Sequence, residues 1–425
     1  MANAKKNSPK GKEPKHGQGP DDGSEGFDDN IRLGAVGDAL FTRAGVAGIA
    51  LLAAGVGLGA SRGDHFQQFF HSYLVAFMWS LAITLGALWW VTLQHLVNAK
   101  WSIVVRRVGE LLASNMILMA ILALPIIADM ADGHSALYIW VDQHKVHEDH
   151  LLHHKAPYLN FGFFVVRCLI YFGFWTLLAR YFLNRSLRQD SGGDATLVDG
   201  MRKASAPGMI AIALTLTFAA FDFLMSLEPA WFSTIFGVYY FAGCVMSWHS
   251  ALALTLIWLQ SRGRLVKSVT AEHYHDIGKM MFAFVIFWSY IGFSQFMLIY
   301  YANVPEETFW FKERLNGGWA NVSWLLLFGH FAVPFFYLLS RHIKRNKKLL
   351  GIGAVWLLFI EYVDMYWIVM PKLHADGPAP GLIDFCCWSG MACLLVAGAA
   401  FHARGKNLLP TKDPRLSQSL SFENI

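Results

Sequence analysis

The chain has 425 residues, of which 55% are apolar and only 15% are charged. A soluble globular domain is usually about a quarter charged, so this composition excludes an ordinary soluble fold. The formal net charge of +5 comes mainly from loops between apolar runs and does not indicate nucleic-acid binding. Apolar runs of about 20 residues recur along the chain, and each is long enough to cross a bilayer core of roughly 30 Å.

The segment 1–38 is polar and rich in Lys, Gly, Pro and Asp, a composition typical of a disordered tail. No apolar run follows the early lysines closely, so we expect no cleavable signal peptide. Further along the chain, the apolar runs predict ten transmembrane helices, over 39–60, 69–96, 108–130, 158–183, 206–227, 231–259, 278–302, 319–340, 349–370 and 381–402. The sequence therefore predicts an all-α, polytopic membrane protein.

Lys and Arg are unevenly distributed between the two sides of these spans. One set of alternate loops, together with both terminal segments, carries 25 of them, whereas the other set carries 6. Loops rich in Lys and Arg stay on the cytoplasmic side of a membrane. We therefore expect both termini to lie in the cytoplasm.

The order of long and short loops predicts an internal repeat. Spans 2–5 and spans 6–9 each begin on the outer side, and in both groups a long outer loop joins the second and third helices. This pattern predicts two four-helix bundles of the same orientation. The predicted units are a cytoplasmic tail (1–38), a flanking helix (39–68), a first bundle (69–230), a second bundle (231–380), and a tenth helix with a cytoplasmic tail (381–425).

The ninth span contains two carboxylates in the run FIEYVDMYW. Glu361 and Asp364 are three residues apart, so they share one face of a helix. An ionised side chain near mid-bilayer costs at least ~2.5–3.5 kcal/mol, so each acid needs a partner, a water path or a role. Two adjacent buried carboxylates repel when both are charged, and we expect at least one to take up a proton near neutral pH. The alternative is a structural ion pair, with Arg167 of the fourth span as the candidate partner.

His330 in the eighth span and His249 in the sixth are the other deep titratable groups. A neutral imidazole can relay protons because one nitrogen donates while the other accepts, although a lone buried histidine is more often a hydrogen-bonded core residue. Asp222 lies near the outer end of the fifth span, ~9 Å from the turn that follows. The candidates for a proton pathway are Glu361, Asp364, Asp222, His249, His330 and Arg167.

The segment EPA at 228–230 predicts a tight turn between the fifth and sixth spans. Pro229 suits the first position of a helix, and Glu228 before it can face the positive end of the sixth helix. A helix cap is a sufficient account of Glu228. Asp222 is therefore the better functional candidate of the two.

The outer loop DQHKVHEDHLLHHK contains the weak candidates for a metal site. Helical spacing would place His147, His150 and His154 on one face, where zinc could bind. The alternative is a solvated loop. All five cysteines lie in predicted spans without a CxxC pair, and we interpret them as buried thiols.

Three segments carry a resemblance to a known family: HKAPYLN at 154–160, EPAWFSTIFGVYYFAG at 228–243, and HDIGKMMFAFVIFWSYIGFSQFMLIYYANVPEETFWF at 275–311. They resemble the ActF-type membrane subunit of bacterial alternative complex III, within the polysulfide-reductase, NrfD-type membrane proteins. The resemblance covers about residues 35–400. It implies two four-helix bundles with flanking helices, in agreement with the predicted topology.

A protein of this type would be a subunit of a quinol:cytochrome c (or other acceptor) oxidoreductase in the bacterial cytoplasmic (inner) membrane. The resemblance implies the following partners: a sister NrfD-like subunit that oxidises menaquinol, an iron–sulfur subunit, multihaem cytochrome c subunits, small membrane subunits and, in some complexes, a terminal oxidase. It implies that iron–sulfur clusters and haem c lie in those partners, and that this chain binds no redox metal. It also implies a proton half-channel here, with Glu361, Asp364, Asp222 and His249 as candidates. It assigns no quinone-binding residue.

Two other functions stay open. A stand-alone secondary transporter would have helices interrupted by Gly or Pro at matching points of its two repeats, but Pro125 and Pro334 fall in spans that do not correspond. A quinone-reactive haem b subunit is disfavoured because His71 and His95 lie at opposite ends of the second span. Haem ligation between helices, by His249 and His330, is the remaining form of that alternative.

Overall fold

The computed structural model describes residues 29–424 and is all-α. Within these residues ten helical segments are long and apolar enough to cross a membrane, which confirms the predicted polytopic membrane protein. They are α1 (Ala35–Arg62), α2 (Gln67–Leu96), α3 (Ile103–Ala113) with α4 (Met116–Ala128), α7 (Phe161–Gly192), α8 (Ala195–Phe223), α9 (Phe236–Ser261), α10 (Ala271–Ala302), α12 (Trp319–Leu326) with α13 (Val333–Leu339), α15 (Lys347–Val369) and α16 (Leu382–Ala403).

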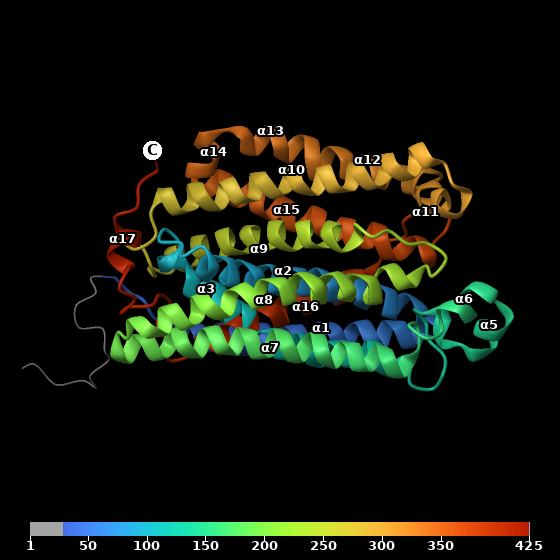
Figure 1. Ribbon diagram of the computed structural model, residues 1–425, viewed down its shortest axis with the longest axis horizontal. Helices are drawn as coiled ribbons and strands as arrows, with labels where there is room; N and C mark the ends of the chain where they lie inside the picture. The colour runs from blue at the N-terminus through green and yellow to red at the C-terminus, as the bar shows by residue number, and fades with distance from the viewer. Residues whose placement is uncertain (1–28, 425) are drawn as a thin grey trace, which may run out of the picture.

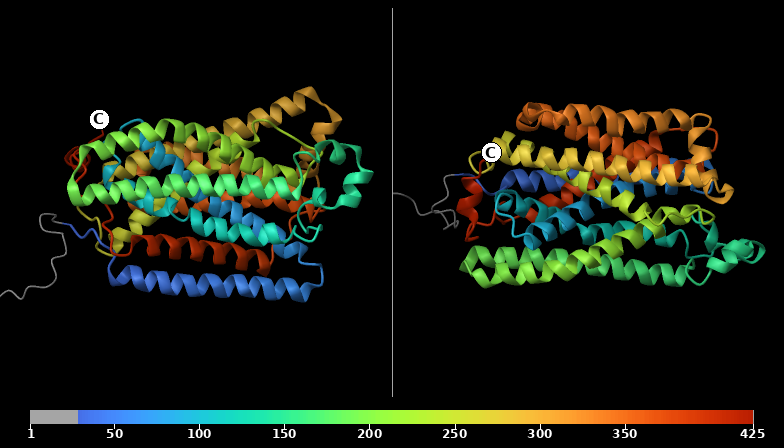
Figure 2. Two further views of the ribbon diagram at one scale, coloured as in Figure 1. Left: turned by 60° about the horizontal axis from the view of Figure 1, so that its bottom comes forward. Right: turned by 45° about the horizontal axis from the view of Figure 1, so that its top comes forward.

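The spanning helices form two four-helix bundles and a flanking pair, as predicted (Figure 1). The first bundle consists of α2, the α3–α4 span, α7 and α8, and the second consists of α9, α10, the α12–α13 span and α15. The flanking helices α1 and α16 pack mainly against each other, and α16 also packs on α2 (Figure 2). The bundles meet where α2 packs on α9. Because α2 is apolar around its whole circumference, it can occupy this central, almost entirely buried position.

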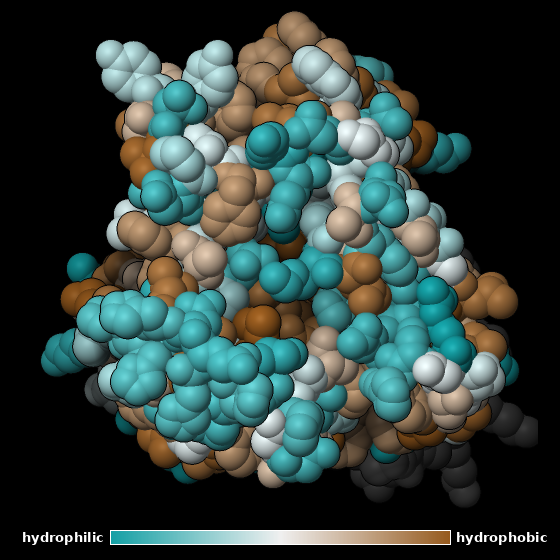
Figure 3. All heavy atoms as spheres, turned by 90° about the vertical axis from the view of Figure 1, so that its right-hand side faces the viewer, coloured by the Kyte–Doolittle hydropathy of each residue, from teal (hydrophilic) through white to brown (hydrophobic). Residues whose placement is uncertain are grey.

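The two ends of the bundle carry different connections. Both ends of the described chain lie at one end, with α14 (Arg341–Arg345) and α17 (Leu416–Leu420). The opposite end carries α5 (Gln143–Glu148), α6 (His150–Lys155) and α11 (Pro305–Leu315). Figure 3 looks onto this second end, where hydrophilic side chains cover much of the face. The two long loops thus lie at the same end, as two bundles of one orientation require.

The N-terminal boundary differs from the prediction. Residues 1–28 lie outside the described part of the chain, but residues 29–38, which we expected in a disordered tail, are ordered and α1 begins at Ala35. Ile31 and Leu33 are buried. The Asp29 carboxylate accepts hydrogen bonds from three consecutive backbone amides, those of residues 266–268. These contacts with distant parts of the chain order residues 29–38, although their composition alone is typical of a disordered tail.

The connection between α8 and α9 is longer than the predicted EPA turn. A 3-10 turn at Met225–Leu227 follows α8, and α9 begins only at Phe236. Glu228 therefore does not cap α9; its carboxylate pairs with Lys372 Nζ at 2.7 Å. Trp231 of this connection stacks on Trp310 of α11, with 4.4 Å between ring centres. The prediction was wrong because these tertiary contacts favour an irregular connection over a helix that starts at Pro229.

Candidate functional site

Three titratable side chains meet inside the second bundle. His330, Glu361 and Asp364 are each fully buried, and one ligand-type atom from each lies within 4.8 Å of the others. His330 Nε2 lies 3.6 Å from Glu361 Oε2. The structure thus brings together three of the six residues predicted for a proton pathway.

Both carboxylates come from α15, and the spacing of three residues places them on one face of that helix. This helix packs against α9. Gly243 of α9 lies directly against Glu361, because a β-carbon at Gly243 would overlap the carboxylate, with only 2.8 Å to its Cδ. Glycine at this position makes room for the acid between two closely packed helices.

His330 lies in an irregular part of its span. Residues Leu327–Ala332 form a π-helix between α12 and α13, a feature that often marks functional positions. Pro334 follows and has no N–H for the carbonyl of His330, four residues earlier. Trp288 of α10 stacks on the His330 ring with 3.7 Å between ring centres, and Met246 Sδ lies 3.3 Å from Nε2. These contacts orient the imidazole toward Glu361.

The two carboxylates differ in their hydrogen bonds. Asp364 accepts one from the Tyr239 hydroxyl at 2.5 Å and one from the Trp288 indole N–H at 3.1 Å. Neither oxygen of Glu361 has a hydrogen-bond partner among the described residues. Two separate negative charges here would be costly, because one would be buried without hydrogen bonds and next to a like charge. The cluster is therefore suited to hold a proton and to exchange it.

An aromatic cavity of about 370 Å³ adjoins the cluster. Tyr239 and Trp288, the two side chains that donate to Asp364, also line this cavity. Much of the remaining wall is aromatic, with Phe236, Phe293, Phe296, Trp310, Phe311, Trp324, Phe331 and Trp367. Asp364 is thus separated by one hydrogen-bonded side chain from a space whose walls suit a planar, lipophilic molecule.

Asp222 and Arg167 form a separate ion pair inside the first bundle. Arg167 donates from Nε and Nη2 to the two oxygens of Asp222, at 2.8 and 2.9 Å, and the Tyr171 hydroxyl donates to the same carboxylate at 2.7 Å. The guanidinium also lies over the Tyr158 ring, 4.0 Å from its centre. The alternative in which Arg167 pairs with the carboxylates of α15 is therefore wrong. We assign Asp222 and Arg167 to packing of α7 on α8.

His249 lies on α9, six residues from Gly243 and hence about 9 Å along the helix. Its Nδ1–H donates to the Val245 carbonyl at 2.7 Å, and its ring packs against Trp90. The structure does not bring His249 into the cluster. His249 and His330 contact different groups. Their contacts therefore give no support to haem ligation between the two imidazoles.

The histidines of the outer loop do not share one helical face. Asp149 ends α5 and accepts from the first amides of α6, so His147 belongs to one short helix and His150 and His154 belong to the next. The expected one-face arrangement is wrong because this aspartate caps a new helix. Within residues 29–424, the one group of three ligand-type side chains close enough to hold a metal ion is His330, Glu361 and Asp364.

A buried charged network at the other end of the bundle was missed in the sequence. Glu110 of α3 lies 3.2 Å from Arg106 Nε and 3.1 Å from Arg107 Nε, and Arg106 Nη2 lies 2.9 Å from Asp413. Arg107 Nη1 pairs with Asp190 at 2.9 Å. The predicted third span begins at residue 108, so both arginines fall in the loop before it. The spacing of three and four residues to Glu110 is the helical signal that could have revealed the network.

Comparison with known proteins adds no relative: no protein-family model matches the chain, and no curated protein matches its sequence. The likeness to ActF-type subunits therefore stays an inference from the three segments quoted above.

Proposed function

We propose that this chain is an integral membrane subunit of a quinol:acceptor oxidoreductase complex, and that His330, Glu361 and Asp364 carry protons within it. The observation that carries the proposal is the lack of hydrogen bonds to the Glu361 carboxyl group among the described residues. Its two buried oxygens have no hydrogen-bond partner among the described residues, yet they lie beside a histidine and a second acid. A buried acid with a purely structural role is normally hydrogen-bonded. An acid that exchanges protons must instead keep an oxygen free of fixed hydrogen bonds.

The proposed path connects groups that are already close together. Tyr239 faces the aromatic cavity and donates to Asp364. Asp364 and Glu361 share one helical face, and Glu361 lies 3.6 Å from His330 Nε2. An imidazole can take up a proton on one nitrogen and release the other proton from the opposite nitrogen. His330 Nδ1 has no hydrogen-bond partner among residues 29–424, so it is free to pass a proton onward.

The aromatic cavity supports the quinol part of the proposal. A quinol is a planar, lipophilic donor of two protons and two electrons, and aromatic walls favour stacking of such a ring. Protons from a quinol in this cavity would reach Asp364 through Tyr239. The electrons would leave to iron–sulfur clusters and c-type haems of partner subunits, in keeping with the resemblance to ActF-type subunits. This chain then needs no redox centre of its own.

The distribution of Lys and Arg supports an orientation with both termini in the cytoplasm, and the resemblance to ActF-type subunits supports a bacterial inner membrane. In that orientation the cavity lies toward the outer half of the membrane, because its residues Trp310 and Phe311 belong to α11.

Glu361→Gln in the complete membrane complex tests the proposal. Quinol-driven electron transfer and proton translocation are measured together in proteoliposomes. We expect the complex to assemble and the number of protons moved per electron to fall. Glu228→Gln is the matched control, because Glu228 pairs with Lys372 outside the cluster. An unchanged proton-to-electron ratio in an assembled Glu361→Gln complex would refute the proposal.

A stand-alone secondary transporter is the second candidate, favoured by three potential cation ligands beside a π-helical segment. The breaks in the spanning helices do not fall in corresponding spans, since one separates α3 from α4 and the other separates α12 from α13. Purified alone in liposomes, a transporter would move a cation or proton down an imposed gradient without quinol. The proposed subunit would not.

A further inference from the structure

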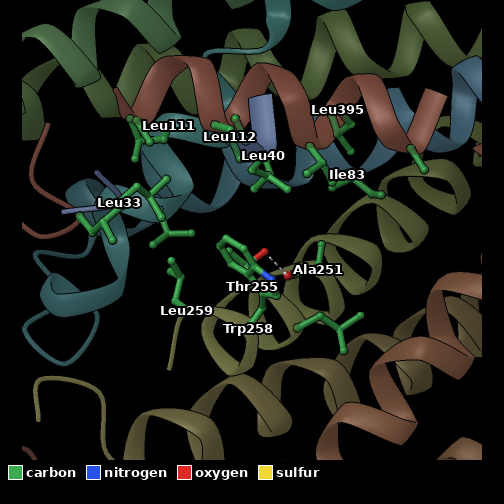
Figure 4. Close-up of a pocket in the computed structure, with 18 of the residues that line it drawn as sticks. Leu33, Leu40, Ile83, Leu111, Leu112, Ala251, Thr255, Trp258, Leu259 and Leu395 are labelled. Atoms are coloured by element: carbon green, nitrogen blue, oxygen red, sulfur yellow. Dashed lines mark hydrogen bonds between the residues drawn. The ribbon is translucent and has the colours of Figure 1, made fainter. Parts of the chain in front are cut away.

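A second cavity lies toward the end of the bundle that carries both ends of the described chain. It measures about 350 Å³, and α9 and α16 form much of its wall, with contributions from α1, α2, α3 and α15. Figure 4 shows Ala251, Thr255, Trp258 and Leu259 on one side of the space and Leu33, Leu111, Leu112 and Leu395 on the other. The Thr255 hydroxyl donates to the Ala251 carbonyl at 2.8 Å, and most of the other wall residues are aliphatic.

The cavity is long and opens toward the lipid-facing surface. Along α16 its wall extends from Ala392 to Ala403, which is about 16 Å at the rise of an α-helix. Val396 in this wall is 44% exposed, so the space communicates with the outside of the bundle. An elongated apolar space of this kind matches the shape of a single hydrocarbon chain.

Three cations lie next to residues that line this cavity. Arg264 donates from Nη2 to the carbonyl of Leu33, a wall residue, at 3.4 Å, and its buried Nε has no hydrogen-bond partner among the described residues. Arg262 lies over the ring of Trp258, another wall residue, at 5.9 Å. Lys406 lies on the segment between Ala403 and Leu408, which also line the cavity.

None of these three cations has a carboxylate partner within the described part of the chain. Nearby acids are engaged elsewhere: Asp38 pairs with Arg404 at 2.7 Å, and Asp29 accepts from the backbone amides of residues 266–268. Positive charge therefore accumulates next to an apolar slot at a membrane surface. This combination is complementary to a molecule with an anionic head and a hydrocarbon tail.

We propose that the cavity binds one acyl chain of an anionic phospholipid, with the lipid phosphate held among Arg262, Arg264 and Lys406. The apolar walls of the cavity bind the apolar acyl chain, and the three cations select a negatively charged head group. The lipid belongs to the leaflet on the side of both ends of the described chain. This site is independent of the proton cluster and of the quinol proposal.

The test uses the full-length chain purified in neutral detergent. Phosphatidylglycerol and phosphatidylcholine with identical acyl chains are titrated separately, and bound lipid is counted by native mass spectrometry. We expect tighter binding of phosphatidylglycerol. Because each cation near a membrane surface contributes attraction equivalent to about a fivefold change in affinity, Arg264→Gln and Lys406→Gln should each weaken phosphatidylglycerol binding about fivefold. Arg188→Gln, at an exposed position of α7 at the same end, should leave it unchanged.

A second pair of variants tests binding in the cavity itself. Ala251→Phe should fill the cavity and abolish binding of both lipids, whereas Ala213→Phe, at an exposed position of α8, should have no effect. Equal affinity for the two lipids in the wild type would overturn the proposal. So would wild-type binding by a folded Ala251→Phe variant. If Ala251→Phe does not fold, the two cation variants still decide the question, because neither changes the apolar walls of the cavity.

Discussion

Gly243→Ala offers a sharp test of how Glu361 is held. The added β-carbon would lie 2.8 Å from both Cδ and Oε2 of Glu361, closer than real non-bonded contacts of this kind. The carboxylate must therefore move away, which disturbs its 3.6 Å approach to His330. Overpacking of this kind costs about 1–3 kcal/mol, and alanine recovers about 0.5–1 kcal/mol relative to glycine in a helix. We expect a net loss of about 1–2 kcal/mol of stability and a clear loss of proton-coupled turnover.

A double-mutant cycle separates this contact from general damage to α9. Thermal unfolding in detergent is measured for Gly243→Ala, Glu361→Ala and the double variant. If the β-carbon acts through the carboxylate, Gly243→Ala should cost little once Glu361 is alanine. Gly173→Ala is the control, because a β-carbon there meets nothing within 4 Å. A coupling energy below about 0.5 kcal/mol, the level expected for independent sites, would refute the reasoning.

The other predictions concern the ion pair, the C-terminal segment and the cluster. Asp222→Ala should destabilise the protein by about 3–5 kcal/mol because it leaves Arg167 buried and unpaired, and Asp222→Leu combined with Arg167→Met should recover most of that loss in thermal unfolding. Burial opposes ionisation of Asp413, but the hydrogen bond from Arg415 and the charge of a second arginine more than offset it and hold the pKa of Asp413 well below its ordinary value. The wild type should therefore be more stable than Asp413→Asn, and this difference in the free energy of unfolding should be complete above about pH 3.9. The difference should shrink as the pH falls from there toward the pKa of Asp413 in the folded protein. Unfolding curves of both proteins across pH measure it. Trp288→Phe keeps an aromatic ring over the His330 imidazole but removes a hydrogen-bond donor to the Asp364 carboxylate. Steady-state assays should show several-fold slower turnover of a complex that still assembles. Unaltered turnover would exclude a role for that donor.

The spanning helices could be predicted because hydropathy over about 20 residues is a local property of the sequence. The shared face of Glu361 and Asp364 could also be predicted, since it depends only on helical spacing. Boundaries were less predictable where tertiary contacts decide them. Residues 29–34 are ordered by contacts with a distant loop, and the connection before α9 is extended by the Glu228–Lys372 pair.

The immediate surroundings of the cluster were beyond sequence reasoning. The approach of His330 to Glu361 depends on how the α12–α13 span packs against α15, and no spacing in the sequence encodes that packing. Gly243 becomes informative only once α9 lies against α15. Tyr239 and Trp288 are two aromatic residues among many, and only their hydrogen bonds to Asp364 distinguish them.

Infrared difference spectroscopy of the complex during quinol turnover addresses proton exchange at Glu361 most directly. We predict a change in the carbonyl band of a protonated carboxylic acid when quinol is oxidised, and its disappearance in Glu361→Gln. An identical difference spectrum in wild type and Glu361→Gln, from complexes that turn over equally fast, would contradict the account.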